Sequence, residues 1–299
     1  MHADDWIVYE QTLPHEDLDG VWDSIVGVDE VKERLINQAL LALRLRRDLS
    51  FTVTALHGLI LLHGSPGTGK TTLARGLAAE IASLVAGGSV RLIEINPHGL
   101  MSAEHGESQQ RVMELLCEQV PLRADDGRPT IVLIDEVESM AVARSEASLK
   151  ANPADVHRAT DAVLTSLDRI AREHPHILTI TTSNFTGMLD EAFRSRADLA
   201  LELPLPDVDG IVAILRRTLG DFATVYPELE HVAQHTQLRA VATALEGLDG
   251  RRVRKAVTEA LAARRATVLD PNRMTVKDML AAARELQAAE TEERQREAA

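Results

Sequence analysis

The chain has 299 residues, of which 45% are hydrophobic and 26% are charged, and its formal net charge at pH 7 is −14. This length can bury one large or two modest hydrophobic cores. The acidic balance and the lack of a basic block disfavour a broad nucleic-acid interface, which must neutralise many phosphates. A single cysteine, Cys117, excludes an internal disulfide framework. No apolar run is long enough to span a membrane and the N-terminus is acidic, so we expect a cytoplasmic protein without nucleic-acid or membrane partners.

The first part of the chain is expected to be a leader followed by a helix. Residues 1–20 are acidic and irregular, with one apolar cluster, WIVY, at 6–9. Residues 22–49 then place apolar side chains at helical spacing behind an acidic start. The sequence therefore predicts a helix ahead of the first strand of an α/β domain.

Residues 59–72, LILLHGSPGTGKTT, combine an apolar strand, a glycine-rich turn and the start of a helix. The turn matches the phosphate-loop pattern G-x-x-x-x-G-K-[ST], in which glycines let backbone N–H groups point at a polyphosphate. Lys70 would reach the β- and γ-phosphates, and the Thr71 hydroxyl would bind Mg²⁺. A glycine-rich turn without a ligand is the alternative. The nucleotide-binding residues predicted here are Ser65, Pro66, Gly67, Thr68, Gly69, Lys70, Thr71 and Thr72.

Strands and helices alternate after this loop, which predicts a parallel sheet. The expected elements are helix 70–85, strand 90–96, helix 107–120 and strand 130–136. The last strand, TIVLIDE, ends in Asp135 and Glu136. At the carboxyl end of a buried strand, Asp135 would hold the water shell of Mg²⁺, and Glu136 would orient and polarise the water that attacks the γ-phosphate. A solvated acidic loop is the alternative.

Two further strands carry polar side chains at or near their ends. A helix over 153–170 leads to strand 176–184, which ends in Asn184. Asn184 is a candidate sensor of the γ-phosphate, although asparagine is also a common turn residue. A short helix and a strand at 199–203 follow, with Arg194 and Arg196 nearby. Either arginine could stabilise the charge of phosphoryl transfer, commonly from a neighbouring subunit, or could be a surface charge.

Beyond Pro206 the sequence predicts helices alone, which indicates a small helical lid. The helices are expected at 208–219, 229–247, 251–266 and 275–288. We therefore divide the chain into a leader or linker at 1–20, a large α/β nucleotide-binding domain at 21–206, a small lid domain at 207–288 and a charged tail at 289–299. The third lid helix begins GRRVRK, so an arginine there could reach a nucleotide.

Together these parts resemble an AAA+ ATPase, an α/β phosphate-loop module with a parallel five-stranded sheet flanked by helices and a small C-terminal helical lid. Within that class, residues 22–268 resemble the HORMA-domain remodellers typified by pachytene checkpoint protein 2, in the short bacterial form. The matching segments are WDSIVG, LLHGSPGTGKTTL, LIEINPHGL, VLIDEVESM with AR following at 143–144, DAVLTSLD, TTSN, AFRSRAD and GRRVRK.

The resemblance implies a role for individual residues. It assigns Glu136, Asn184 and Arg196 to catalysis, with Asn184 as the first sensor and Arg196 as a finger that acts on the neighbouring subunit. Thr71 and Asp135 would be the metal ligands. Arg251 would be the second sensor, and Val26 with Gly27 would close over the adenine, unless that segment is only a packing turn or strand. All of these residues except Arg196, which would act on the neighbouring subunit, would belong to one site for ATP and Mg²⁺.

The resemblance also implies partners. Such ATPases form hexameric rings that thread a terminal segment of a HORMA-domain protein through the pore, and short bacterial relatives are associated with HORMA proteins and nucleotidyltransferases of antiphage signalling. Two features depart from the pattern. About 20 residues precede Val21 where eukaryotic members have a recruiting domain, so we expect no adaptor recruitment. The pore-loop segment 101–108 has Glu104 and His105 in place of aromatic residues.

The alternatives at this point are an AAA+ remodeller of a non-HORMA protein complex and a nucleotide-dependent scaffold or switch with little turnover. A nucleic-acid-handling ATPase is disfavoured by the net charge of −14.

Overall fold

The computed structural model describes residues 6–100, 107–141, 153–185, 187 and 189–297. The chain divides into two compact units. The first unit comprises residues 1–23, 30–64 and 70–203, and the second comprises residues 24–29, 65–69 and 204–299. Each unit is described separately below, and the domain limits given above stay a prediction.

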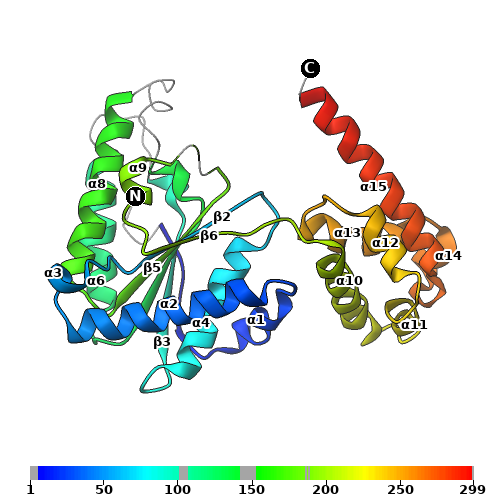
Figure 1. Ribbon diagram of the computed structural model, residues 1–299, viewed down its shortest axis with the longest axis horizontal. Coiled ribbons are helices and arrows are strands. Elements are labelled where there is room, and N and C mark those ends of the chain that lie inside the picture. Colours follow the sequence, from blue (N-terminus) through cyan, green and yellow to red (C-terminus); the bar gives the residue numbers. More distant parts are fainter. Residues whose placement is uncertain (1–5, 101–106, 142–152, 186, 188, 298–299) are drawn as a thin grey trace. The chain divides into compact units, whose positions relative to one another are not determined.

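One six-stranded sheet organises the described part of the first unit, in the order β1-β3-β4-β5-β2-β6 (Figure 1). The strands are β1 (Ile7–Leu13), β2 (Leu59–His63), β3 (Val90–Ile95), β4 (Thr130–Ile134), β5 (Ile177–Ser183) and β6 (Leu199–Glu202). All neighbours from β3 to β6 pair in parallel, so the predicted five-stranded parallel arrangement is confirmed. Parallel pairing brings the carboxyl ends of these strands to one edge.

The sixth strand, β1, corrects the expectation that residues 1–20 are irregular. β1 pairs antiparallel with β3, with Leu13 opposite Val90 and Ile7 opposite Ile95. Its residues, IVYEQTL, alternate between partly buried and exposed positions, and several are good strand formers. Trp6, just before the strand, is 3% exposed and belongs to the main core. The N-terminal segment is therefore part of the sheet.

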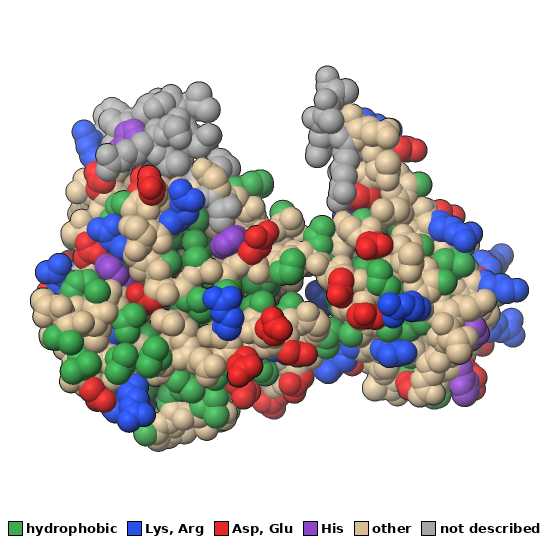
Figure 2. All heavy atoms as spheres, in the orientation of Figure 1, with side chains coloured by type: hydrophobic (Ala, Val, Ile, Leu, Met, Phe, Trp, Pro, Cys, Tyr) green, Lys and Arg blue, Asp and Glu red, His purple; other side chains and the backbone are tan. Residues whose placement is uncertain are grey.

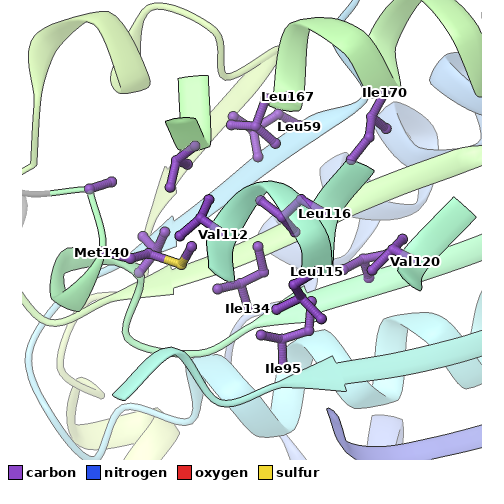
Figure 3. Close-up of a cluster of buried hydrophobic side chains, with 14 of the residues drawn as sticks. Leu59, Ile95, Val112, Leu115, Leu116, Val120, Ile134, Met140, Leu167 and Ile170 are labelled. Carbon is purple, nitrogen blue, oxygen red and sulfur yellow. The ribbon is translucent and has the colours of Figure 1, made fainter. Parts of the chain in front are cut away.

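Helices cover both faces of the sheet, which explains why strands β2, β4 and β5 are apolar or buried along almost their whole length. α4 contacts the strands on one face (Figure 1). On the other face, Leu115, Leu116 and Val120 pack with Ile95 and Ile134 in the core drawn in Figure 3. The helices of this unit are α1 (Val21–Ser24), α2 (Asp29–Asp48), α3 (Phe51–Thr54), α4 (Lys70–Leu84), α5 (Glu107–Glu114), α6 (Val120–Arg123), α8 (Pro153–Glu173) and α9 (Glu191–Arg194).

Between α5 and α6 lies one π-helical turn, η4 (Leu115–Gln119). Pro121, at the start of α6, has no N–H to donate to a regular helical ladder. α5, the π turn and α6 follow one another without a gap over residues 107–123. Three 3-10 turns complete the described part of the unit: η2 (Glu16–Leu18), η3 (Pro97–Gly99) and η5 (Val137–Ser139).

The second unit is a helical bundle with its own core. Its elements are α10 (Val208–Ala223), α11 (Leu229–Ala233), α12 (Leu238–Ala244), α13 (Gly250–Ala262), α14 (Arg265–Leu269), η7 (Pro271–Arg273) and α15 (Val276–Glu297). Leu215, Val257 and Met279 are fully buried in the core that these helices share. The stretch expected as one helix at 229–247 is two short helices, and the charged segment 289–297 continues α15.

Charges of both signs are interspersed on the face of each unit that Figure 2 shows. Several exposed cations pair with acids, as Arg239 does with Asp209 at 2.6 Å and Lys255 with Glu259 at 3.2 Å. Such exposed pairs contribute little to stability. Among the described residues, none of the helices has both the length and the apolar character that crossing a bilayer requires.

Candidate functional site

The loop that follows β2 needs its glycines. Gly64 has φ of +138°, and a Cβ there would lie 2.4 Å from the Leu203 carbonyl oxygen. Gly67 has φ of +79°, and a Cβ there would meet the Asp249 carboxylate. Residues other than glycine rarely adopt such backbone angles, and their side chains would collide with these neighbours. The backbone of the loop is therefore fixed in the curled form that the phosphate-loop motif predicts.

Lys70 and Thr71 begin α4 and point polar atoms toward the carboxyl edge of the sheet. Lys70 is 6% exposed, and its Nζ donates to the Gly64 carbonyl oxygen at 2.8 Å. Thr71 Oγ1 donates to Asp135 Oδ1 at 2.7 Å. Asp135 follows β4, so the strand and the helix bring the two predicted metal ligands together. Thr72 is half-buried in the same turn.

Glu136 has a constrained backbone and a held side chain. Its φ of +52° and ψ of +52° lie in the left-handed region, which is uncommon for a residue other than glycine and typical of functional sites. Its N–H donates to Thr182 Oγ1 at 3.0 Å, and the Thr182 hydroxyl donates in turn to Asp135. Asn184 Nδ2 donates to Glu136 Oε1 at 3.0 Å. The structure thus brings Asp135, Glu136 and Asn184 into one hydrogen-bonded group.

A histidine that the sequence reasoning did not single out completes this group. His98, in η3 after β3, places Nε2 2.9 Å from Glu136 Oε2. A carboxylate only accepts, so this nitrogen carries the proton. Next to the contact lies a cavity of about 250 Å³. Its lining residues are Val8, Thr71, Arg75, Glu94, Ile95, Asn96, His98, Leu133, Asp135 and Glu136.

Arg196 is tied to its own chain at Asp168, on α8. Its Nε and Nη2 donate to the two Asp168 carboxylate oxygens at 2.7 and 2.9 Å, and its Nη1 donates to the Ala192 carbonyl at 2.8 Å. His57 Nε2 lies 3.3 Å from the same carboxylate. Hydrogen bonding to Arg196 lowers the pKa of Asp168. Arg194, by contrast, is exposed and forms no ion pair within the described residues.

The second unit contains its own cavity, of about 320 Å³. Val26, Gly27 and the loop residues Gly67, Thr68 and Gly69 line it. The other lining residues are Ser24, Ile25, Val28, Pro204, Leu205, Pro206, Asp207, Ile214, Gly250 and Arg254. The lining thus consists mostly of glycine, proline and aliphatic residues, with one cation, Arg254, and one carboxylate, Asp207. A flat heterocycle suits such a surface.

The cation in this wall is Arg254, not Arg251. Both arginines lie near the start of α13 and are exposed, but Arg251 is not among the residues that line the cavity. Asp249 caps the helix by accepting from the N–H groups of Arg251 and Arg252 at 2.8 and 3.1 Å. The helix begins at Gly250, so Arg254 lies about one turn after its start. The assignment of Arg251 stays a prediction, and Arg254 is a second candidate.

Three residues at these sites were given no role of their own from sequence: Thr182, His98 and Arg254. Each lies in a matching segment, TTSN, LIEINPHGL or GRRVRK, but the resemblance assigned no role to that particular residue. The available signal was position, because Thr182 and His98 lie near the ends of apolar strands and Arg254 lies one turn into a lid helix. The pore-loop residues Glu104 and His105, and Ala143 and Arg144, lie outside the described residues.

The residues fit a nucleotide and its metal ion. Lys70 is a buried cation at the start of a helix, where anions are favoured. Thr71 and Asp135 offer hard oxygen atoms 2.7 Å apart, and Mg²⁺ prefers such ligands. The glycine positions of the loop leave no room for side chains where backbone N–H groups would approach phosphates. Among the described residues, the first unit thus offers hydroxyl and carboxylate oxygens of the kind that Mg²⁺ prefers, and the second offers a partly apolar cavity.

Comparison with known proteins defines the class. Residues 60–205 match the family described as ATPase family associated with various cellular activities (AAA). The chain belongs to this class of ATPases. It is 44% identical over 273 residues to CD-NTase-associated protein 6 of Pseudomonas aeruginosa, covering 91% of this chain and 90% of that protein. It is also 32% identical over 278 residues to the pachytene checkpoint protein 2 homolog of Arabidopsis thaliana, which covers 82% of this chain and 59% of the relative.

Within the AAA ATPases, the chain therefore belongs to the pachytene checkpoint protein 2-like family, as its sequence motifs predicted. Solved structures agree on the fold. The structure of C. elegans PCH-2 superposes with a TM-score of 0.72 at 25% identity, covering 95% of this chain and 75% of that one. A structure of the E. coli MS115-1 HORMA:CdnC:Trip13 complex contains a chain that matches with a TM-score of 0.75 at 18% identity, covering 95% and 96%.

Proposed function

We propose that this protein is a Mg²⁺-dependent ATP hydrolase that assembles into a ring and remodels HORMA-domain proteins. The observation that supports hydrolysis is the hydrogen-bonded group at the carboxyl edge of the sheet. Thr71 donates to Asp135 at 2.7 Å, and Asn184 donates to Glu136 at 3.0 Å. Thr182 joins the two acids, because its hydroxyl accepts from the Glu136 N–H and donates to Asp135. Membership of the AAA ATPases supports the same activity.

The proposed reaction is attack of water on the γ-phosphorus of ATP. Residues 65–72 bind the phosphates, with Lys70 at the β- and γ-phosphates. Glu136 orients the water and accepts its proton as the new P–O bond forms and the bond to the β-γ bridging oxygen breaks, which releases ADP. Thr71 and Asp135 hold Mg²⁺, which when bound neutralises charge on the phosphate oxygens. Asn184 restrains Glu136 and senses the γ-phosphate.

Other residues complete the proposed site. Val26 and Gly27 contact the adenine in the cavity of the second unit, which they line. Arg251 or Arg254 contacts the phosphates from α13. Arg196 is proposed to stabilise the developing charge on a nucleotide bound to the neighbouring subunit of a hexamer. For this it would have to exchange its contacts with Asp168 for contacts with the phosphate.

The proposed client is a HORMA-domain protein, partly unfolded by threading of a terminal segment through the pore. Two relatives support it: CD-NTase-associated protein 6, which carries nucleotidyltransferase association in its name, and the structural neighbour solved in a complex with a HORMA protein and CdnC. We therefore propose a role in antiphage defence, in which disassembly of a HORMA signalling complex with its nucleotidyltransferase keeps signalling off. Remodelling of a non-HORMA complex, or a scaffold with little turnover, is the alternative.

The test measures the steady-state ATPase rate with and without a candidate HORMA-domain protein, together with size-exclusion chromatography of that partner's complexes. We expect stimulation of hydrolysis and ATP-dependent dissociation of the HORMA complex. Steady hydrolysis with no response to the HORMA protein would retain the ATPase and reject this client. Nucleotide binding without turnover would favour the scaffold.

The role of Glu136 has its own test. Glu136→Gln keeps the size of the side chain and its hydrogen bond to Asn184 but removes the base. Turnover should fall by about 10² to 10⁴-fold, the usual contribution of a general base, while ATP binding and the hexamer persist. Size-exclusion chromatography with radiolabelled ATP would show the trapped ring. Retained turnover would reject the assignment of Glu136.

A further inference from the structure

An ion pair between a buried carboxylate and a half-exposed guanidinium borders the proposed metal ligands. Arg75 Nε and Nη2 donate to Glu94 Oε1 and Oε2 at 2.7 and 2.6 Å. The Glu94 side chain, on β3, is 6% exposed, whereas that of Arg75 is 45% exposed. Removing a carboxylate from water costs several kcal/mol unless it is paired, so Glu94 depends on this guanidinium.

The pair shares a cavity with the metal ligands. Arg75 lies four residues after Thr71 on α4, which places the two side chains on the same face of the helix. Both line the cavity of about 250 Å³, together with Glu94 and Asp135. Hydrogen bonding to Glu94 raises the pKa of Arg75, and the charge of Asp135 raises it further. Arg75 and the carboxylate proposed to hold the metal therefore line the same cavity, where their charges interact.

The ionised side chains of this cavity leave it acidic. It is lined by three carboxylates, those of Glu94, Asp135 and Glu136, and by one guanidinium, that of Arg75. The bidentate contact directs Arg75 at Glu94 rather than at Asp135. Without the Glu94 charge, the guanidinium would instead neutralise Asp135 and compete with a divalent cation for it.

We propose that Glu94 is a positioning residue that sets the affinity of the nucleotide site for its divalent cation, by engaging Arg75 and keeping Asp135 available to the metal. This inference rests on the proposed Mg²⁺–nucleotide site and adds a residue to it. Glu94 itself does not touch the metal or the nucleotide in this role. Its effect passes through the charge and direction of Arg75.

The test is a Mg²⁺ titration of the binding of a fluorescent ATPγS analogue to the full chain, with Mn²⁺ binding followed by electron paramagnetic resonance. In Glu94→Gln the Mg²⁺ concentration for half-maximal binding should rise by roughly fivefold to tenfold. This is the change in affinity expected when one negative charge near the metal is removed in a medium of intermediate dielectric constant. Arg75→Met should lower this concentration, because the cavity gains net negative charge. Arg75→Met/Glu94→Gln should return close to the wild type.

Binding of the analogue in EDTA should be nearly the same in all variants, which separates a metal effect from general damage. The matched control is Glu173→Gln, which breaks the exposed Arg169–Glu173 pair of α8 and should leave the Mg²⁺ dependence unchanged. The opposite sign expected for Arg75→Met tests the inference even if Glu94→Gln fails to fold.

Three results would overturn the inference. One is an equal Mg²⁺ dependence for Glu94→Gln and Glu173→Gln, and another is a rise rather than a fall for Arg75→Met. In both cases the proposed function would still stand, provided that binding of the analogue to the wild type depends on Mg²⁺. The third is a wild type that binds the analogue equally with Mg²⁺ and with EDTA, which would remove the proposed metal site and the inference with it.

Discussion

The imidazole of His98 and the amide of Asn184 hold opposite oxygens of the Glu136 carboxylate, at 2.9 and 3.0 Å. The two donors come from segments that follow β3 and β5, the strands on either side of β4. Together with the left-handed backbone at Glu136, they restrict the directions in which this carboxylate can point. A restrained base loses less entropy when it orients a water molecule.

His98→Ala should lower kcat for ATP hydrolysis by about tenfold and leave KM nearly unchanged, the pattern of an interaction that matters in the transition state. Substitution by glutamine, which offers an N–H donor at a similar reach, should recover part of the loss. Steady-state kinetics at saturating Mg²⁺ would measure both. An unchanged kcat in His98→Ala would show that Asn184 alone is sufficient to hold Glu136.

Arg196 is expected to act on the neighbouring subunit, so Arg196→Ala should reduce hydrolysis by about 10³-fold or more while ATP still binds. Mixing this variant with inactive Glu136→Gln subunits provides the sharper measurement. Mixed rings would place an intact Arg196 beside an intact Glu136, and hydrolysis should reappear. If only a mixture of Arg194→Ala with Glu136→Gln recovers activity, the role belongs to Arg194, which is exposed on α9.

Arg254 should contribute more to nucleotide binding than Arg251, because Arg254 lines the cavity of the second unit. Arg254→Gln should weaken ATP binding by about tenfold, the scale of one lost hydrogen bond to a charged group. Arg251→Gln should have a smaller effect. Isothermal titration calorimetry with ATPγS would rank the two variants, and the reverse order would return the sensor role to Arg251.

Acidification should destabilise the protein below about pH 6.5, the usual histidine pKa. Burial lowers the pKa of His174 and of His176, and the charge of His176 lowers the pKa of His174 further. In the window between the lowered folded pKa and the unfolded pKa, the unfolded chain binds more protons, so the free energy of unfolding falls as the pH falls. Urea midpoints at pH 7.5 and 5.5 would show the loss, and His174→Gln/His176→Gln should reduce the difference.

The sequence was most informative where chemistry requires a local pattern. The phosphate loop, the acids after TIVLI and the asparagine after TTS lie within single strand–loop segments, and apolar runs mark buried parallel strands. These patterns predicted the five parallel strands and the neighbours Asp135, Glu136 and Asn184.

Contacts between distant segments were harder to predict. β1 is polar on one side, and it becomes a strand because β3 supplies a partner about 80 residues later. Thr182 reaches Asp135 because β4 and β5 pair with Ile134 opposite Thr181. His98 reaches Glu136 only through the turn that η3 makes after β3. Such contacts depend on register and on turn geometry, which one sequence does not encode locally.

The pairing of β1 with β3 has a practical consequence for expression and purification. A chain shortened to begin at residue 21 would leave the backbone N–H and C=O groups along one side of β3 without partners and would remove Trp6 from the core. Newly exposed strand edges recruit other strands, and such a product would tend to precipitate or to form amyloid-like aggregates. By covering the edge of β3, β1 thus protects the chain against aggregation.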